Sequence, residues 1–268
     1  MVKTEAIRYI KGRIICSGDK LEYWKYETPI RADSSERSMS RGEDGEKSQH
    51  NLLRAQMQIR QLIWSNLTPY TKVLTLTFAD AELDIKAMRR KITTFLQAMK
   101  RSGYDLKYIW VPEHQSLRGK KEFNEGSLHA HFVIFNDEKI PIEVIKKSWP
   151  WGIFDIHIAN GCRTNDKEKI NSLAAYLSKY ISKETVAKFG CRCFNPSLNL
   201  KRPEVIDIEC YRYQDNNGFY QYTDDGKQDY SDLFNKYNIT WKSGYNYTYN
   251  VNGDDVTNSV LYIQGDKK

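Results

Sequence analysis

The feature that most constrains the fold is the run of residues 126–135, Gly-Ser-Leu-His-Ala-His-Phe-Val-Ile-Phe. It is rich in β-branched and aromatic residues, opens after a glycine and closes at the turn-forming pair Asn136-Asp137, so it predicts a β-strand. Because side chains alternate between the two faces of a strand, His129 and His131 project from the same face. Two imidazoles aimed at one point suit a divalent metal ion, although an isolated His-x-His pair is more often ordinary polar surface.

Other segments predict the partners of this strand. Residues 72–78 alternate as a strand with Val73, Thr75 and Thr77 on one face. Residues 106–111 predict another strand, which the polar residues 115–125 would join antiparallel to the histidine strand. That hairpin would bring Glu113 beside the two histidines. A further strand is expected at residues 153–158, and helices are expected at residues 50–64, 84–102 and 141–148.

These elements predict an α+β fold, with a central antiparallel sheet of about five strands and flanking helices. We expect three parts along the chain. Residues 1–49 form an N-terminal hairpin and flexible linker, residues 50–203 form the main domain, and residues 204–268 form a tyrosine-rich β accessory segment. For the last part we expect short strands and hairpins at the edge of the sheet, with base stacking by its tyrosines as the alternative.

A second pattern lies in the helix expected from about residue 165 to residue 183. Tyr176 and Tyr180 are one helical turn apart, so both hydroxyls can reach the same neighbourhood, and a lysine follows each of them three residues later. Tyrosine is a poor nucleophile at its usual pKa near 10, so phosphoryl transfer to it requires a nearby ammonium or metal ion. Taken alone, the pattern is better explained by a packed helix edge with solvated lysines.

Composition limits the class of partner and the compartment. The 268 residues carry 41 Lys and Arg against 34 Asp and Glu, and a net charge of +7 favours a polyanionic partner. The odd number of cysteines, with no Cys-x-x-Cys pair, argues against a disulfide framework or zinc ribbon and favours a reducing compartment. With no secretion signal or membrane span expected, we predict a cytoplasmic protein of a bacterial or archaeal cell. The cysteines are Cys16, Cys162, Cys191, Cys193 and Cys210.

The ordered set of strand 74–78, His129-Ala130-His131 and helix segment 176–183 resembles the His-hydrophobic-His (HUH) endonuclease superfamily. Within it, the set is similar to the two-tyrosine rolling-circle replication initiator (Rep) proteins of plasmids and single-stranded DNA phages. The resemblance covers roughly residues 70–203, and Ala130 is smaller than the bulky apolar residue usual at that position. It implies an RRM-like palm in which the tyrosine helix overhangs a metal site.

The resemblance also implies an activity, a metal-dependent nuclease and strand transferase that nicks single-stranded origin DNA through a 5′-phosphotyrosine link. Its cofactor would be Mg²⁺ or Mn²⁺, and its partners would be origin DNA, a host helicase and a DNA polymerase. No Gly-x-x-x-x-Gly-Lys-Ser/Thr run is present, so the helicase would be a separate protein. The implied metal ligands are His129, His131 and Glu113. The implied catalytic residues are Tyr176, Tyr180, Lys179 and Lys183.

Several alternatives stay open on the sequence. A relaxase or a transposase of the same superfamily would use the same chemistry on a different DNA, and a non-catalytic single-stranded nucleic-acid-binding protein would use none of it. A two-histidine phosphoesterase fits less well, because the second motif candidate at His157 lacks the required hydroxyl residue. His114 competes with Glu113 as the third ligand, although the two should point to opposite faces of their strand. The order in which the two tyrosines attack is also open.

Overall fold

The protein divides into two compact units, one formed by residues 44–201 and the other by residues 1–43 together with residues 202–268. The computed structural model describes residues 7–32, 44–114, 127–160, 162, 173, 175–177, 194–214, 220–223, 230–251 and 254–268. No helix among these residues is long and apolar enough to cross a membrane.

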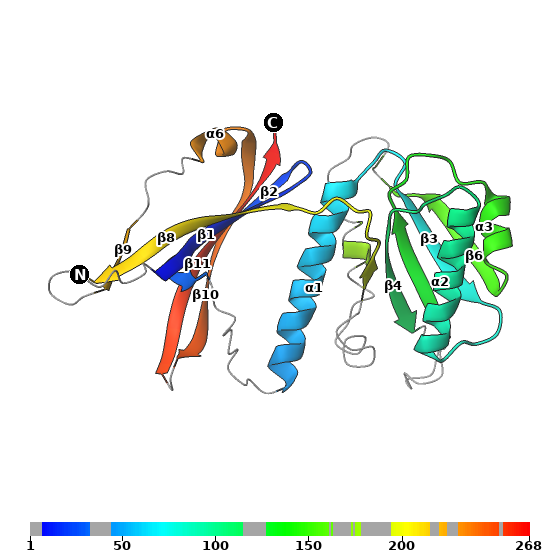
Figure 1. Cartoon of the computed structure of the whole chain (residues 1–268), viewed down its shortest axis with the longest axis horizontal. Coiled ribbons are helices and arrows are strands. Elements are labelled where there is room, and N and C mark those ends of the chain that lie inside the picture. The colour runs from blue at the N-terminus through cyan, green and yellow to red at the C-terminus, as the bar shows by residue number, and fades with distance from the viewer. Residues whose placement is uncertain are drawn as a thin grey trace. The chain divides into compact units, whose positions relative to one another are not determined.

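The unit of residues 44–201 contains a five-stranded sheet in which every paired strand is antiparallel (Figure 1). The strand order is β6-β3-β5-β4-β7, so the histidine strand β5 is central, and the predicted α+β class with a sheet of about five strands is confirmed. The elements are α1 (Asp44–Asn66), β3 (Lys72–Phe78), α2 (Ile85–Arg101), β4 (Tyr108–His114), β5 (Leu128–Ile134), α3 (Ile142–Ser148), β6 (Gly152–Ile158) and β7 (Asn195–Pro196).

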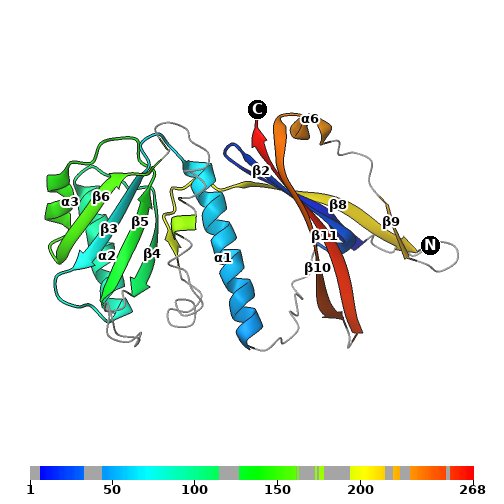
Figure 2. The same cartoon turned by 180° about the vertical axis from the view of Figure 1, so that it is seen from behind.

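Each face of this sheet is covered by different elements. Leu74, Leu76 and Phe132 lie on the face that packs against the apolar sides of α2 and α3, in one core cluster. Figures 1 and 2, which view the unit from opposite sides, show both helices on that one face. Val73 and Val133 lie on the other face, which α1 covers in a second cluster. The alternation predicted for residues 72–78 is therefore confirmed.

Close approach of two strands is possible at β6 because its first residue is a glycine. Gly152 pairs with Phe78 at the end of β3. A Cβ atom added at Gly152 would lie 2.0 Å from the backbone oxygen of Thr77 and 2.7 Å from the backbone nitrogen of Ala79. The neighbouring Trp149 is buried and donates its indole N–H to the same Thr77 oxygen at 3.2 Å. The end of β3 that carries Thr77 is thus fixed from this side.

The other unit is built around a six-stranded antiparallel sheet with the order β10-β11-β2-β1-β8-β9. The predicted N-terminal hairpin is present, and Gly18 takes a positive φ of 59° in its turn. Ile14, Leu21 and Ile208 form the core of this unit. The elements are β1 (Ile7–Ser17), β2 (Lys20–Arg31), β8 (Glu204–Gln214), β9 (Tyr220–Thr223), α6 (Ser231–Phe234), β10 (Tyr237–Val251) and β11 (Asp254–Lys267).

Two expectations for the flanks need correction. The C-terminal strands do not extend the edge of the histidine sheet, because β8 pairs with β1 and β11 pairs with β2 to form a sheet of their own. The expected N-terminal and C-terminal parts therefore belong to one unit. Helix α1 begins at Asp44, so residues 44–49 are helical and not part of a linker, whereas residues 33–43 lie outside the described part of the chain.

Candidate active site

Strand register gathers the polar residues of three strands on the face that α1 covers. His129 pairs with Thr77 on β3 and with Glu113 on β4, and His131 pairs with Thr75 on β3. Directly paired residues in an antiparallel sheet have side chains on the same face. Glu113, His129 and His131 are therefore brought together, as the sequence predicted, with two threonines beside them.

His131 is contacted on both of its ring nitrogens. Its Nε2 lies 2.6 Å from Glu113 Oε2. Its Nδ1 lies 3.2 Å from Thr75 Oγ1 and 3.3 Å from the hydroxyl oxygen of Tyr176. The residue is 6% exposed, so these contacts hold the imidazole in a largely buried position. One imidazole thus joins a carboxylate, an aliphatic hydroxyl and a phenol.

His129 has a simpler environment. Its Nδ1 lies 3.4 Å from Thr77 Oγ1, and its Nε2 has no hydrogen-bonding partner among the described residues. Burial lowers the pKa of His129 below its usual value, and the neighbouring His131 lowers it further against the opposing effect of Glu113. The neutral imidazole, which is the form that binds a metal ion, is therefore favoured.

Tyr176 is brought to the histidines by the packing of its own helical segment. Leu173 and Leu177 are buried in the core cluster that contains α1, as their spacing along the predicted apolar face requires. Tyr176 is partly buried against the same cluster, and its ring meets the His131 ring edge to face, with centroids 6.2 Å apart. The segment thus directs one of the two predicted tyrosines to the histidine pair.

The remaining predicted site residues are only partly described. Lys179, Tyr180 and Lys183 lie outside the described residues. The backbone of His114 pairs with Leu128, and its side chain is likewise not described. Sequence reasoning placed Thr75 on the correct face, as it did Thr77, but did not foresee its contact with a histidine. The signal was the Thr-x-Thr spacing of β3, which matches the His-x-His spacing of β5.

The donor set of Glu113, His129 and His131 is chemically suited to a divalent cation such as Mn²⁺. Their present arrangement is a closed one, and no group of three or more His, Cys, Asp or Glu side chains across the described ranges has the geometry to hold a metal ion. The Glu113 carboxylate is hydrogen-bonded to Nε2 of His131, the nitrogen that a shared ion would need. The Glu113 side chain is 32% exposed, so it has room to rotate away from that nitrogen.

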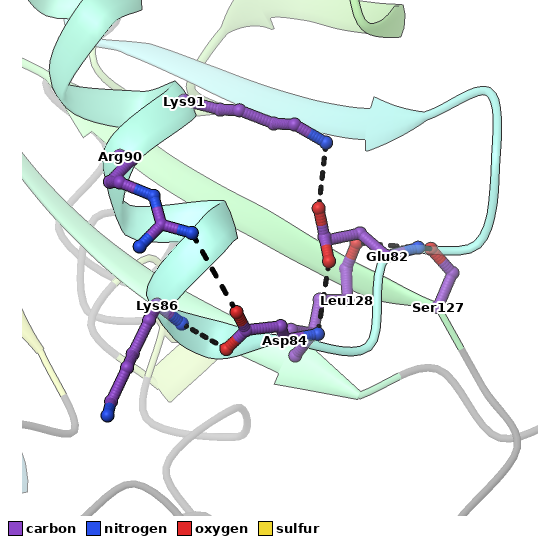
Figure 3. A network of polar contacts seen from close by, with 7 residues as sticks. All are labelled: Glu82, Asp84, Lys86, Arg90, Lys91, Ser127 and Leu128. Carbon is purple, nitrogen blue, oxygen red and sulfur yellow. Dashed lines mark hydrogen bonds and ion pairs between the residues drawn. The ribbon is translucent and has the colours of Figure 1, made fainter.

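A network of polar contacts fixes the chain just before His129 (Figure 3). The backbone oxygen of Glu82 accepts a hydrogen bond from the Leu128 N–H at 2.8 Å, and the Glu82 N–H donates to Ser127 Oγ at 3.2 Å. The Glu82 carboxylate in turn accepts hydrogen bonds from Lys91 Nζ at 2.7 Å and from the Asp84 N–H at 3.0 Å. The start of the histidine strand is therefore tied to helix α2.

Electrostatics favour the charged form of Glu82 in this network. The hydrogen bond from Lys91 lowers the pKa of the Glu82 carboxyl below its ordinary value. The Glu82 side chain is 13% exposed and that of Lys91 is 32% exposed, so water screens the ion pair only in part.

Comparison with known proteins places the same part of the chain in context. Residues 71–185 match a family model of replication-associated proteins, the ORF2 type. The match includes strands β3 to β6 and Tyr176, and it spans less than half of the chain. No curated protein and no solved structure matches the chain. The part of the chain that carries the candidate site is thus similar to replication-associated proteins, and this similarity supports a role in replication initiation.

Proposed function

We propose that this protein nicks and rejoins single-stranded DNA at a replication origin, and that it thereby starts and ends rolling-circle replication. The observation that carries the proposal is the convergence of Tyr176 and Glu113 on His131, at 3.3 Å and 2.6 Å from its two ring nitrogens. A nucleophile and a candidate metal ligand set are thereby neighbours. The match to replication-associated proteins supports the biological setting.

In the proposed reaction, the phenol oxygen of Tyr176 attacks phosphorus in the DNA backbone as the phenolic proton leaves. The bond from phosphorus to the 3′-oxygen breaks, and that oxygen gains a proton to become a free 3′-OH that primes synthesis. The protein keeps the 5′-phosphate as a phosphotyrosine ester. A divalent cation bound by Glu113, His129 and His131 would supply charge stabilisation at the scissile phosphate.

The residues beyond the described part have proposed roles as well. Tyr180 would carry out a second attack of the same kind, which releases the completed circle. Lys179 and Lys183 would stabilise negative charge on the phenolate or the phosphate. A host helicase and a DNA polymerase would open and copy the duplex.

The experiment uses the purified full chain with Mn²⁺ or Mg²⁺ and single-stranded DNA fragments that tile its native replicon. A denaturing gel reads covalent protein–DNA adducts for the wild type, Tyr176→Phe, Tyr180→Phe and the double variant. We expect an adduct that vanishes in the double variant. Tyr70→Phe serves as a matched control, because this tyrosine is 47% exposed and lies in the same unit.

Two outcomes would overturn the proposal. An adduct that persists at wild-type yield in the double variant would exclude both tyrosines as nucleophiles. The absence of any adduct, with the protein folded and DNA bound, would exclude nicking and leave a nucleic-acid-binding protein.

A further inference from the structure

The two threonines of β3 stand in the same relation to the two histidines of β5. Thr75 pairs with His131 and Thr77 pairs with His129. In each pair the threonine Oγ1 lies near the histidine Nδ1, at 3.2 Å for Thr75 and 3.4 Å for Thr77. One strand therefore presents a hydroxyl to the same nitrogen of each imidazole.

The other side of the histidine strand carries the carboxylate. Glu113 lies on β4, across β5 from the threonines, and it contacts Nε2 of His131. An imidazole held through Nδ1 toward β3 directs its Nε2 away from β3. The measured contacts of His131 follow this orientation, and the Nδ1 contact of His129 fits it too.

We propose that Thr75 and Thr77 are positioning residues that hold both histidines with Nε2 directed to the metal site, an inference that rests on the proposed function. A second layer of this kind fixes the orientation and tautomer of metal-binding histidines. Neither threonine would itself bind the metal ion or touch the DNA. Their part is to hold the two rings so that both Nε2 atoms can reach one ion.

A hydroxyl is suited to this position because it can both donate and accept a hydrogen bond. In the arrangement described above, the Glu113 carboxylate draws a proton to Nε2 of a neutral His131, so Nδ1 accepts the hydroxyl proton of Thr75. When Nε2 instead binds a cation, the neutral ring carries its proton on Nδ1 and donates it to the threonine oxygen. Valine has nearly the same shape as threonine but can do neither.

The two pairs differ in one respect. Nδ1 of His131 also has the Tyr176 hydroxyl at 3.3 Å, whereas no second contact to Nδ1 of His129 is found in the described part of the chain. Tyr176 could therefore replace the Thr75 hydroxyl in part. We expect Thr77→Val to weaken metal binding more than Thr75→Val does, and Thr75→Val to weaken it further when combined with Tyr176→Phe.

The test measures Mn²⁺ binding to the full chain by isothermal titration calorimetry, without DNA. The double variant Thr75→Val/Thr77→Val should bind Mn²⁺ about 10- to 100-fold more weakly than the wild type, the usual effect of losing such a second layer. The matched variant Thr75→Ser/Thr77→Ser keeps both hydroxyls and should restore most of the affinity. Circular dichroism verifies that each variant is folded.

A second readout needs no metal. Nitrogen-15 NMR of the histidine rings reports whether each Nδ1 is hydrogen-bonded and which nitrogen carries the proton. In the metal-free protein, the Nδ1 signals of His129 and His131 should move in the valine variant and return toward their wild-type positions in the serine variant.

The outcomes separate this inference from the proposed function. A wild type that binds Mn²⁺ no better than His129→Ala/His131→Ala would refute the proposed metal site, and the role toward metal would fall with it. If the wild type binds Mn²⁺ and the valine variant matches it within twofold, the positioning role alone is overturned. Unchanged Nδ1 signals in the valine variant would overturn it as well.

Discussion

The tie between helix α2 and the histidine strand can be tested by removing the charge of Lys91. In Lys91→Met the side chain keeps its length but loses the ammonium that donates to Glu82 at 2.7 Å. The Glu82 carboxylate then retains only its hydrogen bond from the Asp84 N–H within the network of Figure 3. We expect the unit of residues 44–201 to lose stability, because a mostly buried carboxylate loses its cation.

The size of the effect follows from two contacts. A hydrogen bond to a charged partner contributes about 1.5–3 kcal/mol, and the partial exposure of Lys91 places this one near the lower value. Lys91 Nζ also lies 4.9 Å from the centre of the Phe78 ring, a cation–π contact that adds about 0.5 kcal/mol. The free energy of unfolding should therefore fall by about 2 kcal/mol. For a domain of this size that is a fall in Tm of roughly 4–8 °C.

Chemical denaturation of the wild type, Lys91→Met, Glu82→Gln and the double variant gives the coupling between the two side chains. Lys100→Met is the control on the same helix, because its partner Asp105 is at 3.4 Å and both side chains are more than 60% exposed. We expect the control to change stability by less than about 0.5 kcal/mol. Equal effects of Lys91→Met and Lys100→Met, or a coupling energy of zero, would refute the reasoning.

The same pair gives a pH dependence with a definite sign. Since the folded protein lowers the pKa of Glu82, the stabilisation is present above the usual carboxyl pKa of about 4.5 and is lost as the pH falls below it. The stability difference between the wild type and Glu82→Gln should therefore shrink in acid. A difference that stays constant down to pH 3 would contradict the assigned cause.

Three further predictions concern the site and its supports. Gly152→Ala should cost more than about 3 kcal/mol or displace β6, because the new Cβ would lie 2.0 Å from the Thr77 backbone oxygen, and denaturation would measure the loss. Trp149→Phe should cost about 1–2 kcal/mol, because it leaves that oxygen without the indole N–H and removes part of a buried ring; an unchanged midpoint would contradict this. NMR titration of His129 should give a pKa below 6.5, so the stability that its neutral form contributes is lost as the pH falls through that range, and a value above 6.5 would contradict the assigned effect of burial.

The sequence predicted the histidine sheet well because its strands carry strong local patterns. The period of two in residues 72–78 places Thr75 and Thr77 on one face, and the same period places His129 beside His131. Glu113 was expected near the histidines because a hairpin fixes which residues of its two strands are opposite one another. Each of these inferences needs only a short stretch of chain.

Contacts between distant segments could not be derived in this way. The pairing of β1 with β8 joins residues nearly 200 positions apart, and nothing in the local alternation of either strand identifies its partner. For the same reason, the tyrosine-rich strands were expected at the edge of the wrong sheet. The Thr75 contact to His131 depends on the β3–β5 register, which is set where two separate strands meet.

The amino-acid sequence by itself determined the elements, the faces of the strands and the set of chemical groups that the site has available. Tertiary structure alone decided that Glu113 and Tyr176 contact opposite nitrogens of one imidazole. The physical reason is that periodicity fixes the direction of a side chain relative to its own backbone, whereas the distance between two side chains depends on how separate elements pack. Here that packing is the register of β5 between β3 and β4, together with the burial of Leu173 and Leu177 beneath the tyrosine.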